Sequence, residues 1–398
     1  MPGTQGIGKK TVRDIDVQGK RVLVRVDFNV PLDNGRVTDT TRIRESLPTI
    51  RHLLDHGAAV ILCSHLGRPK GHDPALSLRP VATTLEDMAG VPVRFAEDCV
   101  GPEAERAASE LQPGEVLLLE NLRFHAEEEQ NDEGFARQLA ALADVYVNDA
   151  FGTAHRAHAS TEGVARILPG VAGFLLENEV RYLGTLVANP PKPFAAIIGG
   201  AKVSSKINAL EHLLPSLDVL VIGGGMADTF LAAQGYNLQA SQVETDQFDT
   251  ARRIMVDAEE RGVRLLLPVD VVAASEFSED AEIVTCSPGD IPEGYMALDI
   301  GPTSCEIFVD ALQDAQAIVW NGPMGVFELE PFAAGSLHIA RALAGLHATT
   351  VVGGGETAAL VAQAGMADQI THVSTGGGAS LEMLEGKTLP GVAALQDA

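Results

Sequence analysis

The 398-residue sequence predicts an α/β protein of two doubly wound, Rossmann-like lobes, each with a parallel sheet, joined by a connecting helix. Short apolar runs alternate with amphipathic segments of helical period, which is typical of sheets built from βαβ units. The length suits two or three domains. A proline-rich break at residues 188–193 follows a helical pattern at residues 173–187, and we interpret that helix as the connector.

The composition is that of a globular protein with a sizeable core, since 45% of the residues are hydrophobic and 21% are charged. The formal net charge of −25 argues against nonspecific binding to nucleic acid or anionic membranes. The four cysteines form no CxxC pair, so we expect reduced thiols. No apolar run reaches the ~20 residues of a spanning helix, and no apolar leader is apparent. We therefore expect a cytoplasmic protein without nucleic-acid or membrane partners.

The first half repeats a strand–helix unit. The expected strands are residues 21–28, 58–63, 93–95, 116–119 and 145–147, and the expected helices are residues 42–56, 78–88 and 134–142. Pro48 is an objection to one unbroken helix at residues 42–56. Parallel strands place their carboxyl ends at one edge of the sheet, where ligands of open α/β sheets bind.

Four of these strand ends carry residues that suit one anionic ligand. They are Asp27 and Asn29; His65 and Arg68; Asn121 and Arg123; and Arg156 with His155 or His158, while Arg42 opens the first helix. One loop arginine is usually only solvated, but four at equivalent strand ends of an acidic protein favour a site for a small hydroxylated anion. We interpret the glutamates at residues 127–129 as a solvated loop rather than a metal site.

The strands of the second half end in glycine instead. The expected strands are residues 194–198, 219–222, 318–320, 351–352 and 372–373, each followed by a glycine-containing turn. Glycines let backbone N–H groups approach a phosphate or a flat base closely. One such turn is weak support for a ligand, whereas five in one lobe favour a nucleotide.

The stretch IIGGAKVSSK at residues 197–206 combines a strand, a glycine turn and a helix expected from about Val203. Lys202 and Lys206 are four residues apart, so we expect them on one face of the first helical turn, where a phosphate would bind. The alternative is that both lysines are simply solvated. The spacing is not the GxxxxGK[ST] of phosphate loops.

The two halves together predict one lobe for a small acid and one lobe for a nucleotide. No GxSxG or HExxH motif and no catalytic Cys–His pattern is apparent in the sequence. Phosphoryl transfer fits this pattern because it depends mainly on positioning and on charge stabilisation.

Seven motifs in this order closely resemble the phosphoglycerate kinase family. They are VDFNVPL (residues 26–32), SHLGRP (64–69), ENLRF (120–124), VNDAFGTAHRAHAS (147–160), GGAKVSSKI (199–207), WNGPMGVFE (320–328) and STGGGASLEMLEGK (374–387). The resemblance implies a phosphotransferase of glycolysis and gluconeogenesis. Its reaction is reversible transfer between 1,3-bisphosphoglycerate and ADP, giving 3-phosphoglycerate and MgATP, in line and without a general base.

The resemblance also implies the site residues. The 3-phosphoglycerate site would comprise Asp27, Asn29, Arg42, His65, Arg68, Arg123 and Arg156. The nucleotide site would comprise Gly200, Ala201, Lys202, Lys206, Gly224, Gly225, Ala297, Asn321, Pro323, Val326, Glu328, Gly354, Gly355, Glu356 and Thr357. The catalytic groups would be Arg42, Lys202 and the backbone N–H groups of Gly355 and Gly378, with Glu356 at the Mg²⁺ of MgATP or MgADP.

The implied domains are an acid-binding domain of residues 1–172 with about 379–398, an inter-domain helix of residues 173–188, and a nucleotide-binding domain of residues 189–378. The family closes about a hinge, for which residues 173–187 and 374–378 are the candidates, and it suggests a monomer. Two residues depart from the family pattern: Glu356 stands where an aspartate is usual, and Ala297 where a glycine is usual. A methyl group at Ala297 could crowd the adenine, and Glu356 could shift the metal.

Two other functions fit parts of the pattern. A bilobal sensor could bind the same ligands without turnover, although intact Arg42, Lys202 and Lys206 argue against it. A carboxylate–amine ligase would also form an acyl phosphate, but it needs a third substrate pocket that nothing in the sequence marks.

Overall fold

A computed structural model describes residues 8–398, which divide into two compact units. The first unit contains the described residues up to Arg181 and also Thr388–Ala398, and the second is Tyr182–Lys387. The boundary falls inside helix α5 (Phe174–Ala188). Residues 379–387, which we expected with the first domain, belong to the second unit.

The first unit is built on a six-stranded parallel sheet of order β5-β6-β4-β1-β7-β8. Its strands are β1 (Arg21–Arg25), β4 (Ala59–Cys63), β5 (Val93–Ala96), β6 (Val116–Leu119), β7 (Val145–Asn148) and β8 (Gly170–Ala172). Its helices are α1 (Thr41–Asp55), α2 (Arg79–Ala89), α3 (Gly101–Ser109), α4 (Glu133–Ala140) and α13 (Pro390–Ala393), and a small hairpin pairs β2 (Leu32–Asp33) with β3 (Arg36–Val37). Helix α1 runs through Pro48, so the proline does not break it.

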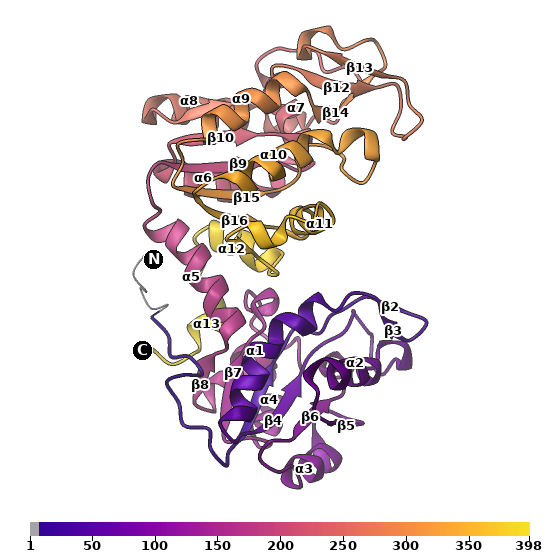
Figure 1. Cartoon of the computed structure of the whole chain (residues 1–398), viewed down its shortest axis with the longest axis vertical. Coiled ribbons are helices and arrows are strands. Elements are labelled where there is room, and N and C mark those ends of the chain that lie inside the picture. The colour runs from indigo at the N-terminus through magenta and orange to yellow at the C-terminus, as the bar shows by residue number, and fades with distance from the viewer. Residues whose placement is uncertain (1–7) are drawn as a thin grey trace. The chain divides into compact units, whose positions relative to one another are not determined.

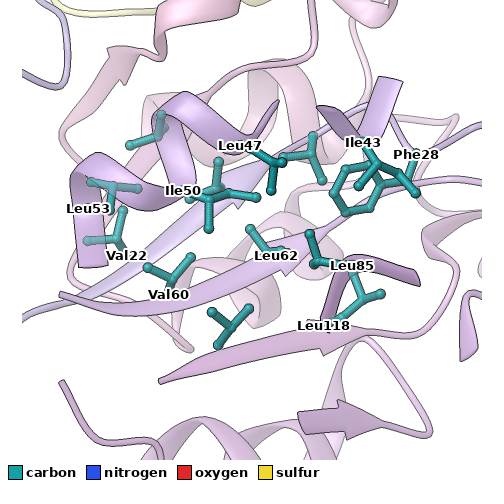
Figure 2. Close-up of a cluster of buried hydrophobic side chains, with 14 of the residues drawn as sticks. Val22, Phe28, Ile43, Leu47, Ile50, Leu53, Val60, Leu62, Leu85 and Leu118 are labelled. Atoms are coloured by element: carbon teal, nitrogen blue, oxygen red, sulfur yellow. The ribbon is translucent and has the colours of Figure 1, made fainter. Parts of the chain in front are cut away.

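The core of the first unit lies between α1, α2 and one face of this sheet. Val22 and Val60 point to that face from neighbouring strands and are fully buried. Figure 2 shows Ile50 and Leu53 of α1 packed over them, with Ile43 of the same helix beside Phe28. Both faces of a parallel sheet are covered, which is why its strands are almost wholly apolar and could be recognised in the sequence.

The second unit has a parallel sheet of order β11-β10-β9-β15-β16-β17. Its strands are β9 (Phe194–Ile198), β10 (Val219–Ile222), β11 (Arg264–Leu266), β15 (Ala317–Asn321), β16 (Thr349–Gly353) and β17 (His372–Val373), and Figure 1 labels the four central ones in this order. Numbered along the chain, the order is the 3-2-1-4-5-6 of dinucleotide-binding domains. The order reverses between β9 and β15, and ligands bind beyond the carboxyl ends of strands at such a point.

The helices of this unit are α6 (Ile207–Leu213), α7 (Gly224–Ala233), α8 (Phe248–Arg261), α9 (Pro302–Leu312), α10 (Ala334–Gly345), α11 (Gly355–Gln363) and α12 (Gly378–Leu384). A three-stranded antiparallel sheet, which we did not expect, joins β13 (Ile283–Cys286), β12 (Val271–Ala274) and β14 (Met296–Ile300). The prediction of two α/β lobes with parallel sheets is confirmed.

Two local predictions are wrong. The α-helix after the glycine turn begins at Ile207 rather than near Val203, and Val203–Ser205 forms a separate 3₁₀ turn. Lys202 is in extended backbone, so the two lysines do not share the first turn of one helix. Strand β1 ends at Arg25, so Asp27 and Asn29 lie in the loop after the strand.

Candidate active site

In the first unit, the loops after β1 and β4 are tied together by the residues predicted for the acid site. The Arg42 guanidinium, from the first turn of α1, forms an ion pair with Asp27. The Asn29 side-chain oxygen accepts a hydrogen bond from the Gly67 N–H at 2.8 Å, and Arg123 donates to the Gly67 carbonyl oxygen, also at 2.8 Å. These contacts draw together three strand ends that are far apart in sequence.

The remaining predicted residues lie on the same loops with fewer contacts. Arg156 is half-buried, and its Nε donates to His155 Nε2 at 3.3 Å. Arg68 is exposed on the loop after β4. Burial, more than any neighbouring charge, lowers the pKa of Arg123, and Arg156 is close enough to lower it further. An anionic ligand bound between these like-charged arginines would therefore be stabilised electrostatically.

Beneath this surface lies a buried layer, here called the support cluster, comprising the predicted His65 together with Arg25, Glu128 and Ser160, which the sequence reasoning missed. Arg25 and Glu128 are both fully buried. Arg25 Nε donates to Ser160 Oγ at 2.8 Å, and Ser160 donates its hydroxyl and its backbone N–H to the two Glu128 oxygens at 2.5 and 2.9 Å. The prediction that residues 127–129 form a solvated loop is therefore wrong for Glu128.

The support cluster fixes the chemistry of His65. Arg25 Nη2 lies 3.2 Å from His65 Nδ1. A guanidinium can only donate, so Nδ1 must be the unprotonated nitrogen and Nε2 must carry the hydrogen. Burial and the adjacent arginines hold the pKa of His65 well below its usual range, so the ring stays neutral. His65 is thus arranged to donate one hydrogen bond from Nε2.

In the second unit, a cavity of about 490 Å³ is lined by the residues that were predicted to bind the nucleotide phosphates. Of the predicted nucleotide and catalytic residues, its lining includes Gly200, Ala201, Lys202, Lys206, Asn321, Gly354, Gly355, Glu356, Thr357 and Gly378. The two lysines therefore line one cavity although they do not share a helical turn. Lys206 donates to the Asn321 side chain, and burial lowers its pKa while Glu356 acts in the opposite direction.

The glycine turns at this end of the sheet are packed against one another. Gly224 has a φ of +63°, and a Cβ there would lie 2.8 Å from the Gly200 carbonyl oxygen. Gly225 is equally close to the backbone of Ala201. The two loops can approach this closely only because neither position carries a side chain.

An adjoining cavity of about 420 Å³ has more apolar side chains in its lining than the first cavity. Of the predicted nucleotide residues, it is lined by Gly200, Ala201, Gly224, Gly225, Ala297, Pro323, Val326, Glu328 and Glu356. Gly200, Ala201 and Pro323 lie in the loops after β9 and β15, and Gly224 and Gly225 begin α7 directly after β10, so this cavity opens where the strand order reverses. Its lining also contains two buried carboxyls, Asp228 and Asp299, which the sequence reasoning did not single out.

Comparison with known proteins decides the family. A family model described as phosphoglycerate kinase matches residues 12–387. The chain belongs to the phosphoglycerate kinase family. The phosphoglycerate kinase of Moorella thermoacetica is 60% identical over 392 residues, which cover 98% of this chain and all of the relative. That of Roseiflexus sp. is 58% identical over 395 residues, covering 98% of this chain and all of the relative.

Solved structures of phosphoglycerate kinases have the same fold. The enzyme of Coxiella burnetii superposes with a TM-score of 0.89 at 40% identity, covering 97% of this chain and 98% of the other. The enzyme of Pyrococcus horikoshii gives 0.85 at 34% identity, again covering 97% and 98%. Phosphoglycerate kinases transfer a phosphoryl group to the carboxylate of 3-phosphoglycerate in glycolysis, with MgATP as the nucleotide substrate, and the chain has this activity class. In residues 8–398, no helix combines the length and apolar character needed to span a bilayer.

Proposed function

We propose that this chain catalyses reversible phosphoryl transfer between 1,3-bisphosphoglycerate and ADP, with the acid on the first unit and the nucleotide on the second. One observation carries the assignment of sites. Each unit gathers anion-binding groups beyond the carboxyl ends of its parallel strands, arginines in one unit and lysines with glycine turns in the other.

The proposed acid site uses Asp27, Asn29, Arg42, His65, Arg68, Arg123 and Arg156. Its cations suit phosphate and carboxylate oxygens, and the neutral His65 supplies a hydrogen bond rather than a charge. The attacking group is a phosphate oxygen of ADP in one direction and a carboxylate in the other. Both are ionised near neutral pH, so no general base is required, which agrees with a site made of cations and N–H donors.

The transferred phosphoryl group needs positive charge around its equatorial oxygens. We assign this role to Arg42 and Lys202, with the backbone N–H groups of Gly355 and Gly378. Arg42 is held by Asp27, and Lys202 is an exposed side chain at the mouth of the phosphate cavity. Removing one such contact should cost about 3 kcal/mol of transition-state stabilisation, by analogy with an oxyanion-hole donor.

Glu356 fits a magnesium ion carried by the nucleotide. Its exposed carboxylate lies in the first turn of α11 and lines both cavities. Mg²⁺ binds to proteins through one or two carboxylates and completes its shell with phosphates and water, so one glutamate suffices. When bound, the ion neutralises charge on the nucleotide phosphates.

We also propose that closure about a hinge in α5 and residues 374–378 brings the substrates together, as family resemblance suggests. Such closure would exclude water and prevent idle hydrolysis of ATP. Action as a monomer in the cytoplasm stays a prediction.

The test is a coupled assay with 3-phosphoglycerate and MgATP on wild type, Arg42→Ala and Arg44→Ala. Arg44 lies on the same helix but is exposed, its guanidinium donates to the Thr40 hydroxyl at 3.3 Å, and it serves as the matched control. We expect Arg42→Ala to lose about a hundredfold in kcat and Arg44→Ala to behave as wild type. Equal activity of all three would remove the role of Arg42.

Lys202→Ala separates an enzyme from a protein that binds without turnover. An enzyme should lose turnover with this variant while ADP binding, measured by calorimetry, changes little. A wild type that binds both ligands but shows no turnover would favour the sensor instead.

A further inference from the structure

The 420 Å³ cavity of the second unit contains two carboxyl groups with the same burial but different surroundings. Asp228 and Asp299 are each only 4% exposed. Asp299 accepts hydrogen bonds from the Gly335 N–H at 2.7 Å and from the Ile300 N–H at 2.9 Å. Its burial therefore has a structural explanation, because it ties β14 to the start of α10.

Asp228 has no such explanation. Within residues 8–398, the structure gives its carboxyl group no hydrogen bond and no ion pair. Burial alone raises the pKa of Asp228, with no neighbouring donor or cation to oppose it. Because the residue lines the cavity, a hydrogen-bond donor on a ligand bound there could pair with the Asp228 carboxyl and would be favoured over a ligand without such a donor.

The place of Asp228 in the fold shows which ligand group it would meet. Asp228 lies on α7, four residues after Gly224 and three after Gly225, so all three residues share one face of the helix. All three line the same cavity, so a base that binds in this cavity beside the two glycines would also lie on the side of α7 that carries Asp228. A base lying on the glycines would therefore have its edge near the Asp228 carboxyl.

We infer that Asp228 is a specificity-determining residue whose carboxyl oxygen accepts a hydrogen bond from the amino group of a purine base. A carboxyl oxygen can accept this bond whether the group is ionised or neutral. A base without that amino group leaves the carboxyl unpaired, which is how buried polar groups discriminate between ligands. This inference rests on the proposed nucleotide site, and it adds the residue that selects adenine.

The experiment compares ADP with purine riboside 5′-diphosphate, which lacks only the amino group, on wild type, Asp228→Asn and Asp228→Leu. Asparagine keeps an oxygen acceptor of the same shape, whereas leucine keeps the volume but no polar atom. Calorimetry gives both dissociation constants, and the KM for 3-phosphoglycerate together with Trp320 fluorescence checks the fold of each variant.

We expect wild type and Asp228→Asn to prefer ADP by roughly three- to tenfold, and Asp228→Leu to bind the two diphosphates equally. ADP binding with no preference in wild type, or a preference that survives in Asp228→Leu, would overturn the inference. Ordered water as the only partner of Asp228 would give that same lack of preference. Failure of wild type to bind either diphosphate would overturn the nucleotide site itself, and the inference with it.

Discussion

Glu128 is linked through a chain of polar contacts to His65, a residue of the proposed acid site. It accepts from Ser160, Ser160 accepts from Arg25, and Arg25 contacts the ring nitrogen of His65. Each member is buried, so no water can replace a lost partner without rearrangement. The single N–H that His65 can offer to a substrate therefore depends on a carboxylate at the far end of the cluster.

We predict that Glu128→Gln raises the KM for 3-phosphoglycerate about tenfold and changes kcat much less. The amide keeps one acceptor for the Ser160 N–H but presents a donor to the Ser160 hydroxyl, and it leaves Arg25 without a buried counter-charge. Steady-state kinetics measures the effect, and ¹⁵N spectra of the His65 ring should show a mixture of tautomers.

The matched control for Glu128→Gln is Glu127→Gln, an exposed neighbour with the same chemistry. If Glu128→Gln left both KM and the His65 spectrum unchanged, the support cluster would have no positioning role.

Asp299 makes the stability of the second unit depend on pH. Burial raises its pKa from 3.8 to about 7. Between these two pH values Asp299 holds a proton in the folded state that it has released in the unfolded state. Its contribution to the free energy of unfolding is therefore largest at low pH and is lost as the pH rises through 7. From pH 5 to 8, the unfolding free energy of wild type should fall relative to Asp299→Asn by about 2 kcal/mol. Urea unfolding followed by the fluorescence of Trp320, the one tryptophan of the chain, measures this difference; a difference independent of pH would contradict it.

At the scale of single elements, the turn between β10 and α7 sets how closely the nucleotide loops approach. We predict that Gly224→Ala weakens ADP binding about tenfold or more, because the new Cβ would force the Gly200 carbonyl away. Gly262→Ala is the control, since Gly262 has a similar φ of +73° but open space around it. Both variants should lose about 1 kcal/mol of stability from the left-handed backbone, and only Gly224→Ala should lose affinity. Equal affinities in calorimetry would show that the loops can separate without consequence.

The sequence predicted most strands of the two parallel sheets but missed β8, which is fully buried but only three residues long, and β11. β4 and β6 are continuous apolar runs that need no context to recognise. Strand β13 of the three-stranded sheet alternates between exposed and half-buried residues, so its sequence lacks the continuous apolar run by which a buried strand is recognised. Helix α6 begins later than predicted because Val203–Ser205 forms a 3₁₀ turn before it, and the residue types of this segment do not predict that turn.

The same contrast explains which site residues could be found. Polar residues directly after apolar strands stand out, so the arginines of the proposed acid site could be named from the sequence. Glu128 and Asp228 could not be, because each is buried by packing between segments distant in sequence. The sequence around Glu128 is three consecutive glutamates, which usually indicate a solvated loop.

For the molecule as a whole, each ligand should stabilise the unit that binds it. Trp320 is fully buried in β15 and reports on the second unit. We predict that ADP at 100 times its dissociation constant raises the unfolding free energy seen by Trp320 by about 2.7 kcal/mol, and that 3-phosphoglycerate alone raises it much less. Urea titrations with each ligand measure this. Equal shifts with the two ligands would mean that the units unfold together.

The first unit also needs the last residues of the chain. Gln396 donates its N–H to the Gly170 carbonyl on β8 and accepts from the Lys10 N–H, both at 2.9 Å, and Asn148 donates to the Gly391 carbonyl at 3.0 Å. A ribosome synthesises β8 long before it reaches residue 388, so in the nascent chain residues 10–12 can already pair with Ala172, while Gly170 and Asn148 still lack the partners that residues 391–396 supply. The first unit, although made first, can be completed only after the second unit has been synthesised.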